Sequence, residues 1–140
     1  IVEAFEGDVT GLSPDLAPGS AVLLDAPCSG SGTWGRHPEG KWRMSPEEAD
    51  RLSELQRQLL DRALSLVPKG GRVVYSTCSL FPEENEKVVA ELLGRRKDLV
   101  EVPFPFKNPL FRKGRPYGTV IWPGLPWVDG FYAAVLMKRR

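Results

Sequence analysis

The chain has 140 residues, of which 41% are hydrophobic and 26% are charged, and its formal net charge at pH 7 is +1. This composition suits one domain with one core, and it excludes a strongly basic or acidic protein whose overall field selects its partner. The longest apolar run, Phe131 to Met137, is far shorter than the roughly 20 residues that span a bilayer. We therefore expect a single domain over residues 1–140, without a membrane partner and located in the cytoplasm.

The first segments of the chain indicate a parallel sheet. Residues 1–5 are typical of a strand end, and the apolar run AVLLDA at 21–26 is typical of a strand buried on both faces. So little chain precedes this strand that its flank is expected to be uncovered. We therefore expect the front part of the fold to be missing, and the open flank to favour self-association or an upstream half of the fold.

A long amphipathic helix is predicted from Pro46 onwards. Ser45 is placed as its N-cap, Pro46 occupies the first helical position and Glu48 closes a capping box. One face carries apolar residues at helical spacing, namely Leu52, Leu55, Leu59, Ala63 and Leu66. Pro68 and two glycines end the helix, and RVVYST at 72–77 is the next strand of a βαβ unit.

The remainder predicts a second helix and an antiparallel strand pair. Pro82, Glu83 and Glu84 are expected to start the helix, which the strand LVEV at 99–102 follows. GTVIWP at 118–123 and GFYAAVLMK at 130–138 are strand candidates joined by a turn. The expected architecture is α/β, with a mostly parallel sheet and an antiparallel C-terminal strand pair.

The only two cysteines, Cys28 and Cys78, each follow a predicted strand in a turn rich in Ser, Gly or Pro. Ligands of parallel sheets lie beyond the carboxyl ends of the strands, so neighbouring strands would bring both thiols to one crevice. For either cysteine alone, a small buried hydrophobe is the commoner role, whereas the paired placement favours chemistry. No metal is expected, because the two thiols and His37 lack C-x-x-C spacing and a fourth ligand.

A thiol nucleophile beside a carboxylate suits methylation of cytosine at C5. Addition of a thiolate to C6 turns the ring into an enamine that attacks an electrophilic methyl group, and a second group then removes the C5 proton. Asp25, at a strand end, is placed to hydrogen-bond the ring nitrogen or the exocyclic amine as charge shifts there. The chemistry alone leaves open which thiol attacks.

Three stretches carry a family resemblance: DAPCSGSGTWGRHPEGKWR, LQRQLLDRALSLVPKGGRVVYSTCSLFPEENE and DGFYAAVLMKR. With FEGD before them, they closely resemble the Sun/Fmu-type family of S-adenosylmethionine-dependent RNA cytosine-5 methyltransferases. The resemblance implies the C-terminal portion of a Rossmann-like class I methyltransferase domain. It also implies S-adenosylmethionine as cofactor and an rRNA or tRNA substrate.

Matching the family motifs position by position assigns roles. Cys78 of the Thr-Cys pair matches the family's nucleophile, and Cys28 of the Pro-Cys pair matches the thiol that helps to resolve the adduct. Asp25 matches the acid beside the cofactor's methyl group and the target base, with Pro27 shaping that turn. Asp8 in FEGD matches the acid that meets the adenine of the cofactor, although a turn or cap role stays open.

A basic, aromatic loop follows the first cysteine. Arg36, Lys41, Trp42 and Arg43 suit phosphate contact and base stacking on RNA, and a solvated loop anchored by Trp42 is the open alternative. His37 in the same loop raises a second alternative, a thiol hydrolase in which it activates the second cysteine.

The chain departs from the family in one respect. No G-x-G-x-G follows a strand, so most of the cofactor site is missing and weak cofactor binding by these residues alone is expected. This departure keeps a third interpretation open, a non-catalytic RNA-binding or assembly module that retains the fold.

Overall fold

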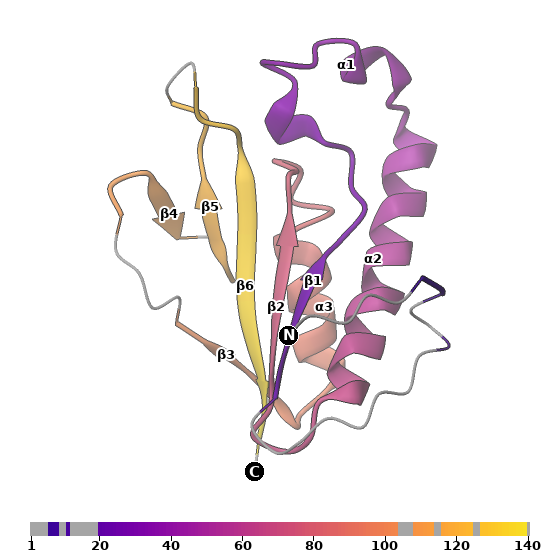
Figure 1. Cartoon of the computed structure of the whole chain (residues 1–140), viewed down its shortest axis with the longest axis vertical. Coiled ribbons are helices and arrows are strands. Elements are labelled where there is room, and N and C mark those ends of the chain that lie inside the picture. Colours follow the sequence, from indigo (N-terminus) through magenta and orange to yellow (C-terminus); the bar gives the residue numbers. More distant parts are fainter. Residues whose placement is uncertain are drawn as a thin grey trace.

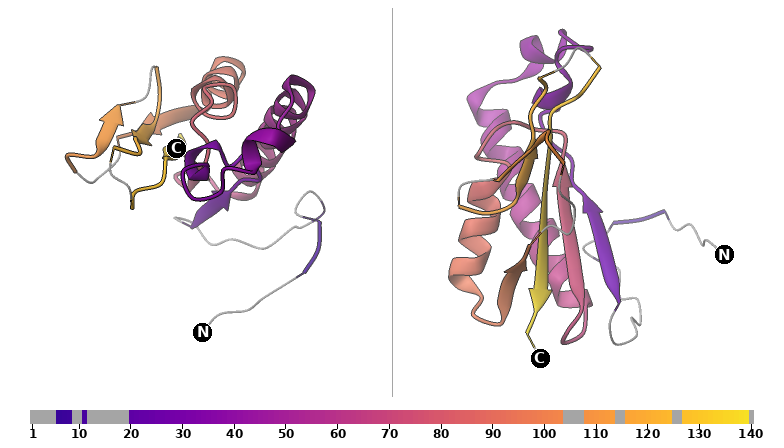
Figure 2. Two further views of the ribbon diagram at one scale, coloured as in Figure 1. Left: turned by 90° about the horizontal axis from the view of Figure 1, so that it is seen from above. Right: turned by 90° about the vertical axis from the view of Figure 1, so that its left-hand side faces the viewer.

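A mixed sheet forms the centre of the computed structural model, which describes residues 6–8, 11, 20–103, 108–113, 116–124 and 127–139. Its strands run in the order β1-β2-β6-β5-β4, and β3 also pairs with β6. The helices α2 and α3 pack on the same face of this sheet (Figures 1 and 2). The described elements are β1 (Ala21–Asp25), η2 (Ser31–Thr33), α1 (Gly40–Arg43), α2 (Pro46–Leu66), β2 (Arg72–Thr77), α3 (Glu86–Arg95), β3 (Leu99–Val102), β4 (Phe111–Lys113), β5 (Thr119–Ile121) and β6 (Phe131–Lys138).

The predicted βαβ unit is confirmed by the pairing of β1 with β2. The two strands run parallel with Asp25 opposite Ser76, and α2 makes the crossover between them. The predicted C-terminal pair is also confirmed, since β5 and β6 are antiparallel. The sheet of the described residues is mixed rather than mostly parallel, because β6 runs antiparallel to β2, β3 and β5 alike.

The start of α2 follows from its capping residues. The Ser45 hydroxyl accepts a hydrogen bond from the Glu48 N–H at 3.2 Å, which satisfies one donor of the first turn. Pro46 takes the first helical position, where no N–H is required. The Ser45 half of the predicted capping box is therefore confirmed. The Glu48 carboxylate, predicted to close the box, binds the Arg51 guanidinium at 2.7 and 2.8 Å instead.

The buried face of α2 differs from the predicted one. Leu52 and Ala63 are buried as expected, whereas Leu55, Leu59 and Leu66 are half-buried. The residues that share full burial are Leu52, Ser53, Gln56, Leu60, Ala63 and Leu64. The helix carries leucines around more than half of its circumference, so their spacing alone did not determine which stripe faces the sheet.

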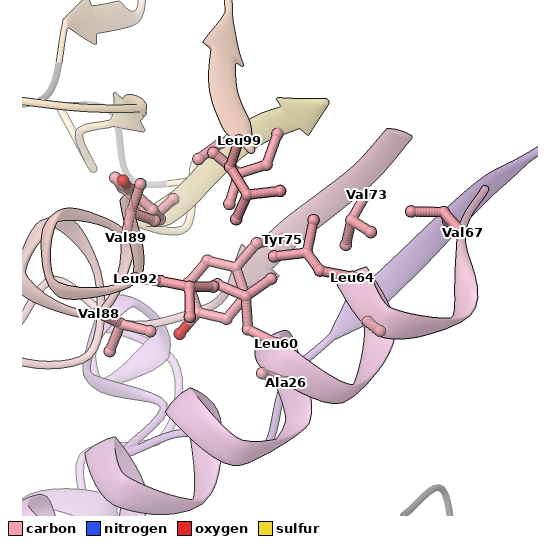
Figure 3. Close-up of a cluster of buried hydrophobic side chains, with 14 residues drawn as sticks. Ala26, Leu60, Leu64, Val67, Val73, Tyr75, Val88, Val89, Leu92 and Leu99 are labelled. Atoms are coloured by element: carbon pink, nitrogen blue, oxygen red, sulfur yellow. The ribbon is translucent and has the colours of Figure 1, made fainter. Parts of the chain in front are cut away.

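The core lies between the helices and the sheet (Figure 3). Leu60 and Leu64 from α2, Val88 from α3 and Tyr75 from β2 are each fully buried. Burial of such side chains contributes about 1.5–3 kcal/mol each relative to exposure. This packing holds α3 against α2, and α2 against β1 and β2, the two strands whose ends carry the cysteines.

The opposite face of β1 is open within the described residues. Leu23 is 70% exposed, while its neighbours Val22 and Leu24 pack against the core. The expectation that this strand is buried on both faces is therefore wrong for the described structure, because α2 and α3 cover only one face (Figure 2). The strand end expected at residues 1–5 lies outside the described residues.

The second helix begins later than predicted. Residues 82–85 form turns, and α3 starts only at Glu86. Glu84 and Asn85 are almost completely buried in this turn, although both are polar. Both side chains bind the loops that follow β1 and β2.

Candidate active site

The two thiols meet at the carboxyl ends of β1 and β2. Cys28 lies three residues after β1 and Cys78 directly follows β2, and their Sγ atoms are 3.3 Å apart. The parallel pairing of Asp25 with Ser76 brings the two loops to the same edge of the sheet. The structure thus places both cysteines in one half-buried site, together with the end of β1.

The thiol pair is electrostatically asymmetric. The hydrogen bond from Cys28 is the main cause that lowers the pKa of the Cys78 thiol from 9.0 to about 7. The same bond, with burial, raises the pKa of Cys28 well above its ordinary value. The two shifts favour the state in which Cys78 is the thiolate and Cys28 is the donor of the bond between them.

Asp25 is the last residue of β1. Its Oδ1 accepts a hydrogen bond from the Ser76 hydroxyl at 3.2 Å, and the residue is exposed at the end of β1. Its negative charge also acts on Cys78, where it raises the thiol pKa and partly offsets the effect of Cys28. Pro27, also exposed, accepts a hydrogen bond at its carbonyl from the Gln56 amide at 2.8 Å, which ties the turn to α2.

A close approach of backbones joins the first thiol loop to the second. The N–H of Gly32 donates to the Cys78 carbonyl at 2.9 Å, and the Gly130 N–H donates to the Gly32 carbonyl at 2.8 Å. A Cβ at position 32 would lie 2.1 Å from the Gly130 oxygen and 2.8 Å from the Cys78 oxygen. Position 32 therefore accepts only glycine without a shift of backbone.

Glu84 is a site residue that the sequence analysis placed at a helix start. Its side chain is fully buried, and four donors surround the two carboxylate oxygens. The Ser29 N–H donates at 2.8 Å and the Ser29 hydroxyl at 2.5 Å, the Gln56 amide donates at 3.1 Å, and the Ser79 hydroxyl also donates. Glu84 thereby links the residue after Cys28 to the residue after Cys78.

Asn85 fixes the second loop from within. The Thr77 hydroxyl donates to the Asn85 side-chain oxygen at 2.6 Å, and the Asn85 amide donates to the Ser79 carbonyl at 2.9 Å. These two bonds bracket Cys78. Neither Glu84 nor Asn85 stands out by periodicity, and the residues from Pro82 onward predict a helix start rather than a buried turn.

The basic loop lies at the same end of the sheet as the thiols, where α1 and the start of β6 also lie (Figure 1). Lys41, Trp42 and Arg43 belong to α1 and are exposed, Trp42 to 90%. The alternative in which Trp42 anchors the loop is therefore wrong. Trp34 packs instead edge-to-face against Phe81, with ring centroids 5.6 Å apart.

Arg36 forms a fork with Asp129. Its Nε donates to one carboxylate oxygen of Asp129 at 2.9 Å and its Nη2 contacts the other. This ion pair connects the loop after β1 to the segment before β6, and it holds the pKa of the Asp129 carboxyl below its ordinary value.

Two further predicted residues are His37, which lies within the basic loop, and Asp8, which lies ahead of β1. The His37 Nδ1 is 3.6 Å from a carboxylate oxygen of Glu39, and both side chains are largely exposed, so that the ring faces a surface acid. Asp8 is exposed in the short described stretch 6–8, and its carbonyl accepts a hydrogen bond from the Gly11 N–H at 3.0 Å.

The described residues form neither a metal-binding cluster nor a membrane-spanning helix. Among them, no group of three or more His, Cys, Asp or Glu side chains could hold a metal ion. None of the helices within the described ranges combines the length and the apolar character needed to cross a membrane.

Known proteins share both the sequence and the fold of this chain. Ribosomal RNA small subunit methyltransferase B of Thermus thermophilus is 42% identical over 137 residues, which cover 94% of this chain and 32% of that protein. The crystal structure of PH0851 superposes with a TM-score of 0.78 at 42% identity, covering 85% of this chain and 26% of that one. The crystal structure of NSun6 from Pyrococcus horikoshii with SFG has a TM-score of 0.78 at 26% identity, covering 97% of this chain and 34% of that one.

The family assignment rests on a match over almost the whole chain. The family model of the 16S rRNA methyltransferase RsmB/F matches residues 4–137. The chain spans about a third of the length of the relatives that it matches. The Rossmann-like fold and the Sun/Fmu-type resemblance are thereby confirmed, and the chain belongs to the RsmB/F family of rRNA methyltransferases.

Proposed function

We propose that this chain carries the two-thiol part of an active site that transfers a methyl group to C5 of cytosine in RNA. The observation that supports this most is the Cys28–Cys78 pair, with sulfur atoms 3.3 Å apart at the strand ends and unequal acidities. Relatives are named as rRNA methyltransferases, which makes rRNA the first substrate to test, ahead of tRNA. Such a substrate implies a cytoplasmic location.

Cys78 is the proposed nucleophile. Its thiolate donates an electron pair to C6 of the cytosine, which forms the S–C6 bond and moves the C5–C6 π electrons so that C5 becomes nucleophilic. Of the two thiols, Cys78 has the lowered pKa, and it therefore supplies more thiolate near neutral pH.

S-adenosylmethionine, when bound, supplies the electrophilic methyl group that the activated C5 attacks. Asp25 and Asp8 are the residues of this chain proposed to contact it, with Pro27 shaping the turn beside Asp25. An exposed carboxylate is an acceptor suited to the hydroxyl and amine donors of such a cofactor, and Asp25 meets this condition at the end of β1. The P. horikoshii NSun6 structure with SFG, an analogue of S-adenosylmethionine, supports this compound as the cofactor.

Asp25 has a second proposed role toward the base. As electrons move into the ring during attack, its carboxyl group hydrogen-bonds the ring nitrogen or the exocyclic amine. Its bond to the Ser76 hydroxyl at 3.2 Å restrains the side chain beside the thiols. The carboxylate would thus orient the pyrimidine before the S–C6 bond forms.

Cys28 is proposed to help resolve the adduct. Once Cys78 is bonded to carbon it carries no negative charge, and the hydrogen bond that raised the pKa of Cys28 is lost. Cys28 then ionises more easily and is placed to assist removal of the C5 proton. The electron pair of that C–H bond restores the C5–C6 double bond and expels the Cys78 thiolate.

The exposed loop beside the thiols is the proposed RNA contact. Lys41 and Arg43 offer cations for phosphates, and Trp42 offers an uncovered ring for base stacking. Arg36 belongs to this surface as well, held by its fork with Asp129. These residues lie on α1 and the loop before it, at the thiol end of the sheet (Figure 1).

The test is covalent trapping on RNA that contains 5-fluorocytosine. Fluorine at C5 cannot leave as a proton does, so a C6 adduct stays bonded to its nucleophile and shifts the protein on a denaturing gel. The chain is incubated with S-adenosylmethionine and this RNA, with and without a polypeptide that carries the preceding part of the catalytic domain. An adduct that Cys78→Ala abolishes and Cys28→Ala retains supports the proposal.

The opposite outcome has an equally clear meaning. If no adduct forms even with the preceding part present, the transfer reaction is wrong for this chain, and RNA binding without catalysis becomes the function to test. An adduct that forms only with the preceding part would show that these residues supply one part of a shared site, which a second polypeptide or the rest of a longer one completes.

A further inference from the structure

One buried carboxylate, that of Glu84, binds both thiol loops. The Glu84 carboxylate accepts hydrogen bonds from Ser29, which follows Cys28, and from Ser79, which follows Cys78. Its exposed fraction is 0%, so solvent does not share in these contacts. Gln56 of α2 donates to the same carboxylate at 3.1 Å and to the carbonyl before Cys28 at 2.8 Å.

The backbone of Glu84 is also held in place. The Tyr75 hydroxyl donates to the Glu84 carbonyl at 2.5 Å, and Tyr75 is itself fully buried on β2. The backbone of Glu84 is thus held from β2, and its side chain is held from α2 and from both loops. Other contacts also join the two loops, namely the Ser29–Ser79 and Ser31–Ser79 hydroxyl pairs and the Gly32 N–H on the Cys78 carbonyl. Glu84 adds a charged acceptor that the residues following both cysteines share.

A buried carboxylate at position 84 lowers the stability of the fold unless its hydrogen bonds offset the loss of hydration. Removing a charged group from water costs several kcal/mol, and well-packed apolar residues stabilise a core at least as well. An apolar side chain at position 84 could fill the space but could not bind the hydroxyl and N–H groups of Ser29 and the hydroxyl of Ser79. The arrangement therefore specifies the relative position of the loops rather than core packing.

We propose that Glu84 is a positioning residue, which holds the Cys28 and Cys78 thiols within contact of each other by binding Ser29 and Ser79. The role in catalysis rests on the proposed function, whereas the positioning of the thiols does not. Glu84 itself touches neither sulfur in this assignment. It acts through the two serines.

The direction in which the Cys78 pKa changes in Glu84→Gln distinguishes a positioning role from a purely electrostatic one. The charged or titratable groups that act on Cys78 are Cys28, Asp25 and Glu84, and the charge of Glu84 raises the Cys78 pKa. If Glu84 acted by charge alone, Glu84→Gln would lower that pKa. If Glu84 positions the thiols, the variant weakens the Cys28 hydrogen bond, which is the largest cause of the lowered value, and the pKa rises.

The experiment measures alkylation of Cys78 by iodoacetamide across a pH series, with the modified peptide quantified by mass spectrometry. For the unaltered chain the midpoint is expected at about 7. For Glu84→Gln the midpoint moves upward, and the alkylation rate near neutral pH falls about three- to tenfold. A midpoint that stays in place or moves downward overturns the proposal.

Two further variants make the result specific. Ser29→Ala removes one link while it keeps the charge of Glu84, so the same upward shift is expected even if Glu84→Gln does not fold. Glu101→Gln is the matched control, because Glu101 is a carboxylate on β3 that binds the Gly118 N–H at 2.5 Å, outside the thiol loops. Its Cys78 midpoint should equal that of the unaltered chain, and an equal upward shift in this control would overturn the proposal.

Alkylation requires neither RNA nor cofactor, so it reports on positioning alone. Adduct trapping is then repeated with Glu84→Gln, and a yield at least threefold lower than that of the unaltered chain is expected. If the unaltered chain forms no adduct while the midpoint shift is observed, the proposed function fails and the positioning role stands. If the adduct forms equally in both and the midpoint is unchanged, the positioning role fails and the proposed function stands.

Discussion

The N–H of Gly32 donates to the carbonyl oxygen of Cys78 at 2.9 Å, so the loop after β1 is bonded to the peptide of the second cysteine. Because a Cβ at position 32 would lie 2.1 Å from the Gly130 oxygen, Gly32→Ala must push these backbones apart. We expect a loss of about 1–3 kcal/mol in the free energy of unfolding, measured by chemical denaturation, and a Cys78 thiol of more ordinary acidity. Gly35→Ala is the matched control, because nothing lies within 4 Å of a Cβ there. Equal stability of Gly32→Ala and the unaltered chain would contradict the close approach.

Removal of Cys28 should change the acidity of Cys78. The hydrogen bond between the thiols is the largest cause that lowers the Cys78 pKa from 9.0 to about 7. Without it, the midpoint of Cys78 alkylation in Cys28→Ala is expected to rise toward 9.0, which leaves less thiolate near neutral pH. Cys28→Ser, which keeps a donor, should show a smaller rise. The prediction is wrong if both variants alkylate with the midpoint of the unaltered chain.

The distance between the thiols predicts ready disulfide formation. Hydrogen peroxide oxidises the Cys78 thiolate to a sulfenic acid with cleavage of the O–O bond, and the Cys28 thiol then attacks that sulfur and releases water. The sulfur atoms need to approach from 3.3 Å to about 2.05 Å, which adjacent loops can accommodate. We expect intact-protein mass spectrometry to show a loss of two hydrogens that dithiothreitol reverses. Persistent sulfinic acid at Cys78 without a crosslink would argue against the observed proximity.

Truncation of Trp42 should weaken RNA binding with little loss of stability, whereas truncation of Trp34 should lower stability. Trp42 is 90% exposed, so Trp42→Ala is expected to change the free energy of unfolding by less than about 0.5 kcal/mol. Loss of a stacking surface should nevertheless weaken binding to single-stranded RNA by about 1–3 kcal/mol, measured by fluorescence anisotropy. Trp34→Ala, which removes the contact with Phe81, should instead lower stability by about 2–4 kcal/mol. Unchanged RNA affinity in Trp42→Ala would remove this residue from the proposed contact surface.

Local sequence patterns predicted the parts of this fold that depend on local physics. The capped start of α2 at Pro46 and the strands β1, β2 and β6 follow from capping residues and apolar runs, and their order placed both cysteines at one sheet edge. The buried stripe of α2 did not follow, because leucines occur on more than one face of this helix and the sheet selects among them. The direction of β6 is likewise a tertiary property that no period of two or 3.6 encodes.

The link through Glu84 could not be predicted for a related reason. Its contacts join residues that are 55 positions apart for Ser29 and 28 apart for Gln56. A glutamate two residues after a proline has the same local appearance whether it starts an exposed helix or enters a buried network. Only the pairing of β1 with β2 creates the space in which this carboxylate becomes a site residue.

The crossover between β1 and β2 also determines when reactivity first arises. Parallel strands need the whole connection before they can pair, so the first cysteine is synthesised long before the second one, 50 residues later, can reach it. Until α2 has docked and the strands have aligned, each thiol is an ordinary cysteine of the nascent chain, mostly protonated near neutral pH. The acidity of Cys78 is thus a property of the folded structure, which the nascent chain acquires only when the two strands have paired.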